Sequence, residues 1–187
     1  MEPAPSPAAI RSLRPNLTQA QAIARFEGGL LRLPRWLGGA PLRSVADAYL
    51  PFHVYEVEVT SSARPYVTWL AVDAVDGSLD PFQFDRAPSP DELALVETRN
   101  RPVATLAESE AARLLEDKLR RIVYQTGFFR ARRLSFRATR VPLDLHVPYW
   151  LGFYEQGGGV RLRVLDAVRR RFEGGRARAL FTSWIAG

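Results

Sequence analysis

Hydrophobic positions recur with the period of a helix in two segments, one in each half of the sequence. The first segment spans residues 17–32 and the second follows Thr105, and in both of them apolar residues recur every three or four positions. This spacing places the apolar side chains on one face of a helix, as in a helix that packs against a sheet. Each segment opens with the spacing of a capping box, Asn16 with Gln19 and Thr105 with Glu108. We therefore predict one helix near the start of each half.

After each predicted helix, apolar and polar residues alternate, which is typical of half-buried strands. The segments with this pattern are residues 49–59, 66–72 and 79–84 in the first half, and 133–139, 149–155 and 160–168 in the second. Asp76-Gly77 is a strong hairpin signal because both residue types tolerate positive φ. The run Gly157-Gly158-Gly159 joins two predicted strands, so it too is interpreted as a hairpin turn and not as a phosphate-binding loop.

The same landmarks occur in the same order in the two halves. A helix opening is followed by a proline that leads a strand, Pro51 or Pro148, and then by an Asp-Ala pair at Asp73 or Asp166. Repetition of this kind indicates an internal duplication. The predicted fold class is α+β, with two repeated units that are each a helix followed by an antiparallel β-meander, either sharing one sheet or packed as a pseudo-symmetric pair. The predicted division is a flexible segment 1–15, a first repeat 16–85, a linker with a short helix 86–104, and a second repeat 105–187.

The repeated unit resembles the PepSY-type domain, in which a cystatin-like sheet wraps one helix. The resemblance depends on Val72-Asp73-Ala74-Val75-Asp76-Gly77 in the first copy and on Leu165-Asp166-Ala167-Val168 in the second. The second copy departs from the pattern, with Arg169-Arg170 where the first has Asp76-Gly77. The resemblance implies an inhibitory, binding or assembly module, and related domains usually lie outside the cytoplasm.

Four residues of the two hairpins are predicted to have a structural role in the turns: Asp73, Asp76, Gly77 and Asp166. A carboxylate at the end of a strand accepts hydrogen bonds from the amides of the turn that follows, and this sets the register of the hairpin. The alternative is that a pair of carboxylates performs acid–base catalysis. We therefore expect substitution of these aspartates to lower stability.

Composition excludes several classes of chemistry. The chain has 187 residues and no cysteine, so it holds no disulfide, thiolate metal site or cysteine nucleophile. The start, Met1 to Pro7, lacks the basic and apolar regions of a signal peptide, and no apolar run approaches the roughly 18 residues of a membrane span. These features predict a cytoplasmic protein without a transmembrane segment.

No motif predicts a metal, a cofactor or an enzyme. The two histidines, His53 and His146, lack the spacing of a zinc site and are interpreted as local hydrogen-bonding residues. The acidic stretch from Asp73 to Asp85 does not match the ligand positions of a calcium loop. Neither a phosphate-binding loop nor a nucleophilic-serine motif is present. A hydrolase that uses scattered carboxylates is therefore only a third alternative.

Positive charge is concentrated in the second half of the sequence. Residues 1–103 hold 10 basic and 12 acidic side chains, whereas residues 104–187 hold 16 and 8. The candidate binding residues are Arg130, Arg132, Arg133, Arg137, Arg140, Arg161 and Arg163. Charge separated in this way indicates an acidic partner.

Three interpretations of these arginines stay open. They form a merely solvated face, in a chain that uses arginine in place of lysine. They contact an acidic surface, either that of a partner protein, for instance Glu56 and Glu58 of another copy, or that of the first repeat of the same chain. Alternatively they bind nucleic acid, with Tyr149, Trp150 and Phe153 stacking on bases. We predict the second, a non-enzymatic binding or assembly module, and expect a protein partner or self-association.

Overall fold

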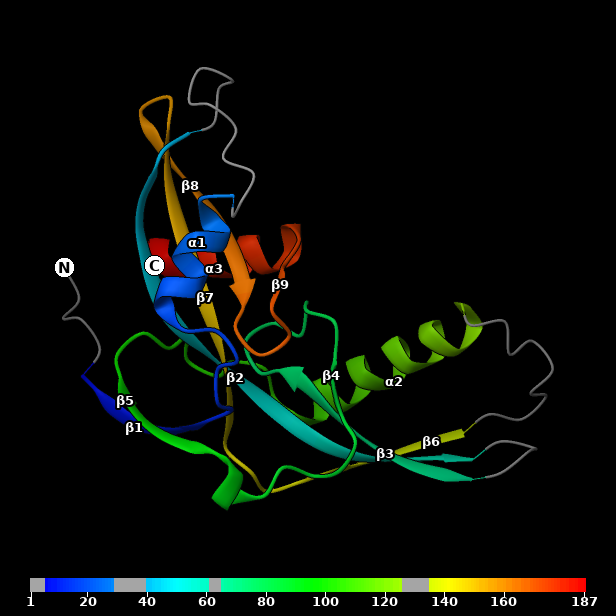
Figure 1. Ribbon diagram of the computed structural model, residues 1–187. Helices are drawn as coiled ribbons and strands as arrows, with labels where there is room; N and C mark the ends of the chain where they lie inside the picture. The colour runs from blue at the N-terminus through cyan, green and yellow to red at the C-terminus, as the bar shows by residue number, and fades with distance from the viewer. Residues whose placement is uncertain (1–5, 29–39, 61–64, 126–134) are drawn as a thin grey trace. The chain divides into compact units, whose positions relative to one another are not determined.

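The chain folds as a mixed α/β protein with a large, mostly antiparallel sheet. The computed structural model describes residues 6–28, 40–60, 65–125 and 135–187 (Figure 1). Within these residues there are three α-helices and nine strands. The coarse α+β class is therefore as predicted. No helix in the described part of the chain is long and apolar enough to cross a membrane.

The elements follow one another along the chain as a long series of strands interrupted by helices. The strands are β1 (Ala8–Ser12), β2 (Leu42–Thr60), β3 (Tyr66–Asp73), β4 (Phe82–Phe84), β5 (Ala94–Thr98), β6 (Ser135–Arg140), β7 (Leu145–Gln156), β8 (Gly159–Asp166) and β9 (Arg171–Phe172). The helices are α1 (Gln19–Phe26), the 3₁₀ turn η2 (Pro90–Glu92), α2 (Glu108–Gln125) and α3 (Gly175–Ala186).

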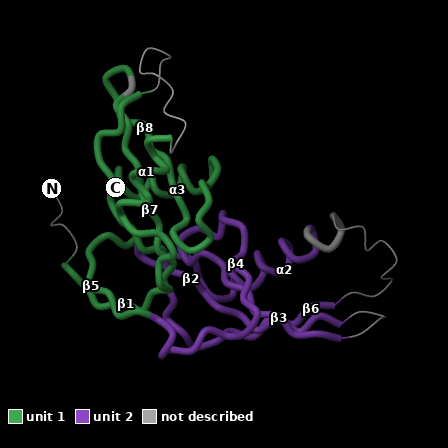
Figure 2. The backbone as a smooth tube through the Cα atoms, in the orientation of Figure 1, with its two compact units in different colours: residues 1–50, 94–102, 146–187 green, residues 51–93, 103–145 purple. Residues whose placement is uncertain are grey.

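Two compact units divide the chain, and each draws on both halves of the sequence (Figure 2). Unit 1 comprises residues 1–50, 94–102 and 146–187, and unit 2 comprises residues 51–93 and 103–145. These units differ from the predicted sequential repeats 16–85 and 105–187. The reason is that α1 packs on the β7–β8 hairpin, whereas α2 packs on the β2–β3 hairpin.

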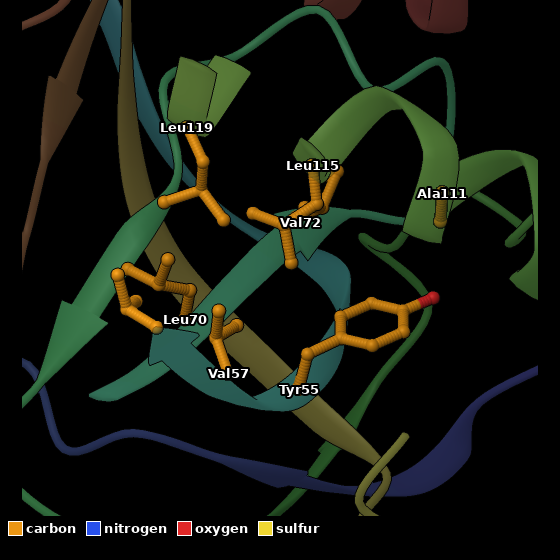
Figure 3. Packing of buried hydrophobic residues seen from close by; sticks show 8 residues of the cluster. Tyr55, Val57, Leu70, Val72, Ala111, Leu115 and Leu119 are labelled. Carbon is orange, nitrogen blue, oxygen red and sulfur yellow. The ribbon is translucent and has the colours of Figure 1, made fainter. Parts of the chain in front are cut away.

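Unit 2 has its core between α2 and an antiparallel layer in which β2, β3 and β6 supply the packed side chains and β4 pairs with β3. Residues 52–59 of β2 pair with β3, and residues 55–60 pair with β6. One face of this layer meets the helix, and Figure 3 shows the side chains that interlock there. The buried members of the cluster are Tyr55, Val57, Val59, Leu70, Val72, Ala111, Leu115 and Leu119. Alternate residues of each strand supply this face, as the sequence pattern predicts.

In unit 1 the β7–β8 hairpin carries a helix on each face. On one face Phe26 of α1 packs against Tyr154, with the ring centroids 6.4 Å apart. On the other face Phe181 of α3 packs against Tyr149, with the ring centroids 5.3 Å apart. Tyr149 and Tyr154 are an odd number of residues apart on β7, so their side chains lie on opposite faces. Unit 1 is therefore a helix–sheet–helix arrangement.

The N-terminal cap of α1 differs from the predicted one. Asn16 and Gln19 do not form the capping box; Thr18 and Gln21 do, with the amide of Gln21 donating to Thr18 Oγ1 over 3.3 Å and the amide of Thr18 donating to Gln21 Oε1 over 3.0 Å. Asn16 instead donates from Nδ2 to the Val168 carbonyl over 2.8 Å. The Asn16 side chain therefore binds a residue distant in sequence and does not cap the helix. The described helix ends at Phe26, and the predicted continuation to residue 32 lies beyond the described residues.

Three further segments differ from the sequence prediction. Residues 1–15 were expected to be flexible, yet β1 within them pairs antiparallel with β5 along its five residues. The predicted linker 86–104 contains the expected short helix, η2, but also strand β5. Helix α3 was not predicted, because Gly174 and Gly175 at its start are residues that favour turns. Each of these elements is stabilised by a partner distant in sequence.

Candidate functional site

The seven candidate arginines are distributed over different parts of the structure. Arg130, Arg132 and Arg133 lie outside the described residues. Arg137 and Arg140 belong to β6 of unit 2, whereas Arg161 and Arg163 belong to β8 of unit 1. The arginines on β6 and β8 are therefore considered separately.

Arg140 is engaged within unit 2. Its Nε lies 3.5 Å from Glu108 Oε1, and its Nη2 lies 3.2 Å from His53 Nδ1. Its Nη1 also donates to the carbonyls of Val54 and Val141, and its Cζ lies 5.9 Å from the ring centroid of Tyr55. These contacts connect β2, β6 and the start of α2. Arg140 therefore has a structural role, and its charge is largely compensated.

Arg137 is exposed on β6 directly opposite Glu58 of β2. Opposite charges at facing positions of an antiparallel pair contribute roughly 0.2–1 kcal/mol. Glu58 is one of the two acidic residues expected to receive the arginines of another copy. Its cross-strand neighbour within the same chain is already a basic residue, which weakens the case for that particular contact.

Arg161 and Arg163, in contrast, line a cleft of about 120 Å³ in unit 1. The cleft runs beside β8 at the point where β9 ends. Its lining residues are Arg161, Leu162, Arg163, Val164, Phe172, Glu173 and Arg178, and we call it the arginine cleft. Arg178 comes from the first turns of α3, so one strand, β8, and one helix bring three arginines to the same cleft.

Arg163 is held in position by aromatic rings. Its Cζ lies 4.0 Å from the ring centroid of Phe172 and 5.9 Å from that of Tyr154. Phe172 in turn packs edge-on against Phe26, with centroids 5.5 Å apart. Gly152 makes room for this cluster, because a Cβ there would lie only 2.7 Å from the Phe26 ring. Arg163 is therefore half-buried and oriented before any ligand arrives.

The arginine cleft has an uncompensated positive charge. Its one acidic lining residue, Glu173, already pairs with Arg171, whose Nε lies 3.2 Å from Glu173 Oε1. Within the described part of the chain, neither Arg161 nor Arg178 has an acidic group within ion-pair distance. Both of these side chains are exposed.

The charge distribution also differs between the compact units. By sequence, unit 1 holds 15 basic and 7 acidic side chains, whereas unit 2 holds 11 and 13. Unit 1, which contains the arginine cleft, therefore carries the net positive charge of the chain, whereas unit 2 is slightly negative; the excess in residues 104–187 is shared between the two units. Such an excess attracts an acidic partner before contact is made.

The two predicted turn aspartates are fully buried, and their carboxylates accept hydrogen bonds from turn amides. Asp73 accepts from the amides of Asp76 and Gly77 through Oδ1 and from the amide of Leu79 through Oδ2, over 2.8–3.1 Å. Lys118 Nζ donates to the Gly77 carbonyl over 2.6 Å, so the turn is also anchored to α2. Burial raises the pKa of Asp73, although its three amide donors oppose that shift.

Asp166 occupies the equivalent position in the other hairpin. Its Oδ1 accepts from the amides of Val168 and Arg169 over 2.8 and 2.7 Å, and its Oδ2 lies 4.0 Å from Arg169 Nε. Burial raises the pKa of this carboxyl as well, against the effect of the two amides and of Arg169. Both carboxylates face the backbone of their own turn, which favours a structural role over acid–base catalysis.

The two turns share a backbone conformation despite their different sequences. Gly77 has φ +66° and Arg170 has φ +58°, each four residues after its aspartate. Arg170 is a non-glycine residue in the left-handed region, where side chains are disfavoured. Its guanidinium donates twice to the Asn16 carbonyl, over 3.0 and 2.8 Å, and these bonds offset the cost.

The histidines and aromatic residues do not form the sites considered for them. His53 Nε2 lies 3.0 Å from the Leu106 carbonyl, and His146 is buried; within the described residues, no three metal-binding side chains come together. Tyr149 is 2% exposed, and Trp150 donates its Nε1 hydrogen to the Leu17 carbonyl over 3.1 Å. Tyr149 is therefore enclosed in unit 1, whereas Trp150 is half-buried against the α1 cluster and Phe153 is half-buried.

Sequence reasoning missed two important parts of the arginine cleft, Arg178 and Phe172. Arg178 lies on a helix that the local pattern did not predict, and Phe172 lies on a strand of only two residues. The available signal was weak: an aromatic residue close to a run of arginines. No family model, curated protein or solved structure matches this chain.

Proposed function

We propose that this protein is a non-enzymatic binding module whose arginine cleft in unit 1 receives an acidic segment of a partner protein. One observation carries the proposal: Arg161, Arg163 and Arg178 converge on one cleft whose single carboxylate is already paired with Arg171. Guanidinium groups match the geometry of carboxylates and form two parallel hydrogen bonds with them. The cleft is therefore chemically suited to Asp and Glu side chains.

The arrangement favours an acidic protein over a nucleic acid. Binding of single strands usually combines basic residues with exposed aromatic faces on which bases stack. The aromatic ring that lines the cleft, Phe172, has Arg163 packed on it at 4.0 Å. The cleft thus offers several cations, and one face of its ring is already covered by a guanidinium group, although Phe172 is still 39% exposed.

The experiment is a fluorescence-anisotropy titration with a labelled oligoglutamate peptide, compared with a single-stranded oligodeoxynucleotide of similar charge. We expect the peptide to bind, and the double variant Arg161→Glu/Arg178→Glu to lose that binding. A matched control is Arg11→Glu/Arg99→Glu, because these exposed residues also belong to unit 1 but do not line the cleft. Both double variants change the net charge equally.

The outcomes separate the alternatives. Equal loss in both double variants would mean that only overall charge matters, which contradicts a defined site. Tight binding of the oligonucleotide with a steep salt dependence, lost in the cleft variant, would instead support the nucleic-acid alternative. Hydrolysis of neither probe is expected.

The proposal extends to the origin of the chain, which we infer to be duplication of a PepSY-like unit. Corresponding hydrogen bonds support it: Ala74 N donates to Pro51 O over 2.8 Å, and Ala167 N donates to Pro148 O over 3.1 Å. In each hairpin, the carbonyl of the residue after the Asp-Ala pair also accepts a hydrogen bond from a side chain that comes shortly before a helix in the sequence. These donors are Thr105 Oγ1, to Val75 O over 2.6 Å, and Asn16 Nδ2, to Val168 O over 2.8 Å.

On this interpretation the two copies have exchanged their helices, because the helix of each half meets the hairpin of the other. Thr105→Val and Asn16→Ala should then lower the free energy of unfolding by similar amounts, about 1 kcal/mol each. Urea titrations of the two variants test this. A clear loss in only one of them would contradict the equivalence of the two contacts.

A further inference from the structure

The open edge of β8 lies along the arginine cleft. β8 pairs with β7 over its whole length, from Gly159 to Asp166, but with β9 only at Leu165 and Asp166. A further hydrogen bond runs from the amide of Glu173 to the carbonyl of Val164, after which β9 leaves the strand. Within the described residues, no strand pairs with residues 159–163 on that side.

The backbone groups that face this open side can be identified from the pairing. Because the Val164 carbonyl points toward β9, and backbone groups of a strand alternate in direction, the amide and carbonyl of Leu162 point to the same side. The amide and carbonyl of Val160 point to this side as well. Residues 161–164 are consecutive and all line the cleft. Since consecutive side chains of a strand point to opposite faces of the sheet, a cleft lined by all four residues lies along the edge of the strand. The cleft is thus bordered by backbone donors and acceptors as well as by arginines.

The arginines lie on both faces of this edge. Arg161 and Arg163 project to the face that carries Leu165, which packs with Phe26 of α1. Arg178 approaches from α3, which covers the other face and contacts β8. In Figure 1 the two helices lie on either side of the β7–β8 hairpin. A strand added here would direct its alternate side chains toward Arg161 and Arg163 on one face and toward Arg178 on the other.

We propose that the acidic partner segment binds as an added β-strand along residues 159–163 of β8, continuing the line that β9 begins. This inference rests on the proposed function and adds the conformation of the ligand. Main-chain hydrogen bonds to Leu162 and Val160 provide the register, and carboxylates on both faces of the segment pair with the guanidinium groups. The ligand class is an extended acidic peptide of at least about five residues.

The test uses a nine-residue peptide with Glu at the odd-numbered positions and at position 4, and Val at the other even-numbered positions, so that an added strand carries carboxylates on both faces. Glu→Gln and scrambled peptides serve as controls. Two further versions carry backbone N-methyl groups, one on the odd-numbered residues and one on the even-numbered residues. An added strand directs alternate amides toward its neighbour, so one N-methylated peptide should bind at least about tenfold more weakly than the parent while the other binds normally. The protein is unaltered in this comparison and stays folded.

A second measurement follows amide hydrogen exchange by NMR. Peptide binding should slow exchange at Leu162 and leave Arg163 unchanged, because the Arg163 amide faces β7. If the parent peptide binds and neither N-methylated version is impaired, the cleft recognises charge alone, and strand addition is overturned while the proposed function stands. If the acidic peptide does not bind at all, the proposed function fails together with this inference.

Discussion

The guanidinium of Arg163 lies over the ring of Phe172, with its Cζ 4.0 Å from the ring centroid. This contact joins β8 to the short strand β9 and orients one of the three cations of the arginine cleft. Because Phe172 also packs on Phe26, the position of Arg163 depends on the core beneath α1. Binding and packing are therefore coupled in unit 1.

Phe172→Leu should weaken binding of an acidic peptide by about twofold to fivefold. Leucine keeps an apolar contact with Phe26 but removes the ring face, and a cation–π contact at a partly exposed site contributes about 0.5–1 kcal/mol. Isothermal titration calorimetry with the oligoglutamate peptide measures the change. Unaltered affinity would mean that Phe172 does not orient Arg163.

Gly152→Ala should destabilise the protein by about 1–3 kcal/mol, since the added methyl group would lie 2.7–2.9 Å from three atoms of the Phe26 ring. In the double variant with Phe26→Leu, part of this loss should be recovered because the smaller side chain removes the clash. A double-mutant cycle from urea denaturation gives the coupling. Additive losses would contradict the close approach.

Asp73→Ala should lower the free energy of unfolding more than Asp166→Ala. Asp73 accepts three turn amides and Asp166 accepts two, and each buried donor left without its acceptor costs about 1–3 kcal/mol. Asp76→Ala is the matched control, because Asp76 is exposed and, among the described residues, its side chain accepts a single hydrogen bond, from the amide of Ser78 over 2.9 Å. A loss in the control as large as that of Asp73→Ala would contradict the ranking, and unchanged stability in both buried variants would rule out turn capping.

The raised pKa of Asp73 predicts a pH dependence of stability. A carboxyl whose pKa is higher in the folded state than in the unfolded state binds its proton more tightly when folded, so its contribution is greatest below the ordinary value of 3.8 and declines as pH rises through the folded pKa. The free energy of unfolding of the wild type minus that of Asp73→Asn should therefore fall between about pH 4 and neutrality. Denaturant titrations across this range test the sign. A difference that grows with pH would mean that the amide donors outweigh burial.

Arg140→Gln should reduce stability and leave peptide binding unchanged. The substitution removes the hydrogen bond to His53, and a hydrogen bond to a charged group contributes about 1.5–3 kcal/mol. It also removes the ion pair with Glu108, which contributes only about 0–1 kcal/mol because the Glu108 side chain is 65% exposed. Thermal denaturation and the peptide titration are measured on the same sample. Loss of affinity with intact stability would reverse the roles assigned to the β6 and β8 arginines.

The local elements of this fold were largely predictable. The alternation in residues 49–59 and 66–72 corresponds to β2 and β3, and the helical period after Thr105 corresponds to α2. These features follow from local patterns, because the spacing of apolar residues over a few helical turns or strand residues determines which face of the element is buried. The partners of short elements were not predictable in this way. β1 and β9 have few residues and weak patterns. β1 is stabilised by β5, a strand distant in sequence, and β9 by pairing with the preceding strand, β8.

Of the candidate site, the sequence alone identified Arg161 and Arg163 but not their companions. Arg161 and Arg163 are two positions apart on β8, and every second side chain of a strand lies on the same face in any fold. Arg178 joins them only because α3 packs on the opposite face of the same hairpin.

By itself, then, the sequence determined helices α1 and α2, the main hairpins and the excess of arginine, since these follow from local patterns and composition. Only the tertiary structure decided which helix packs on which hairpin and where positive charge collects. The apolar face of a helix can be buried by either hairpin, so the local pattern does not select between them. The choice depends on contacts between residues far apart in the chain, such as Phe26 against the backbone of Gly152.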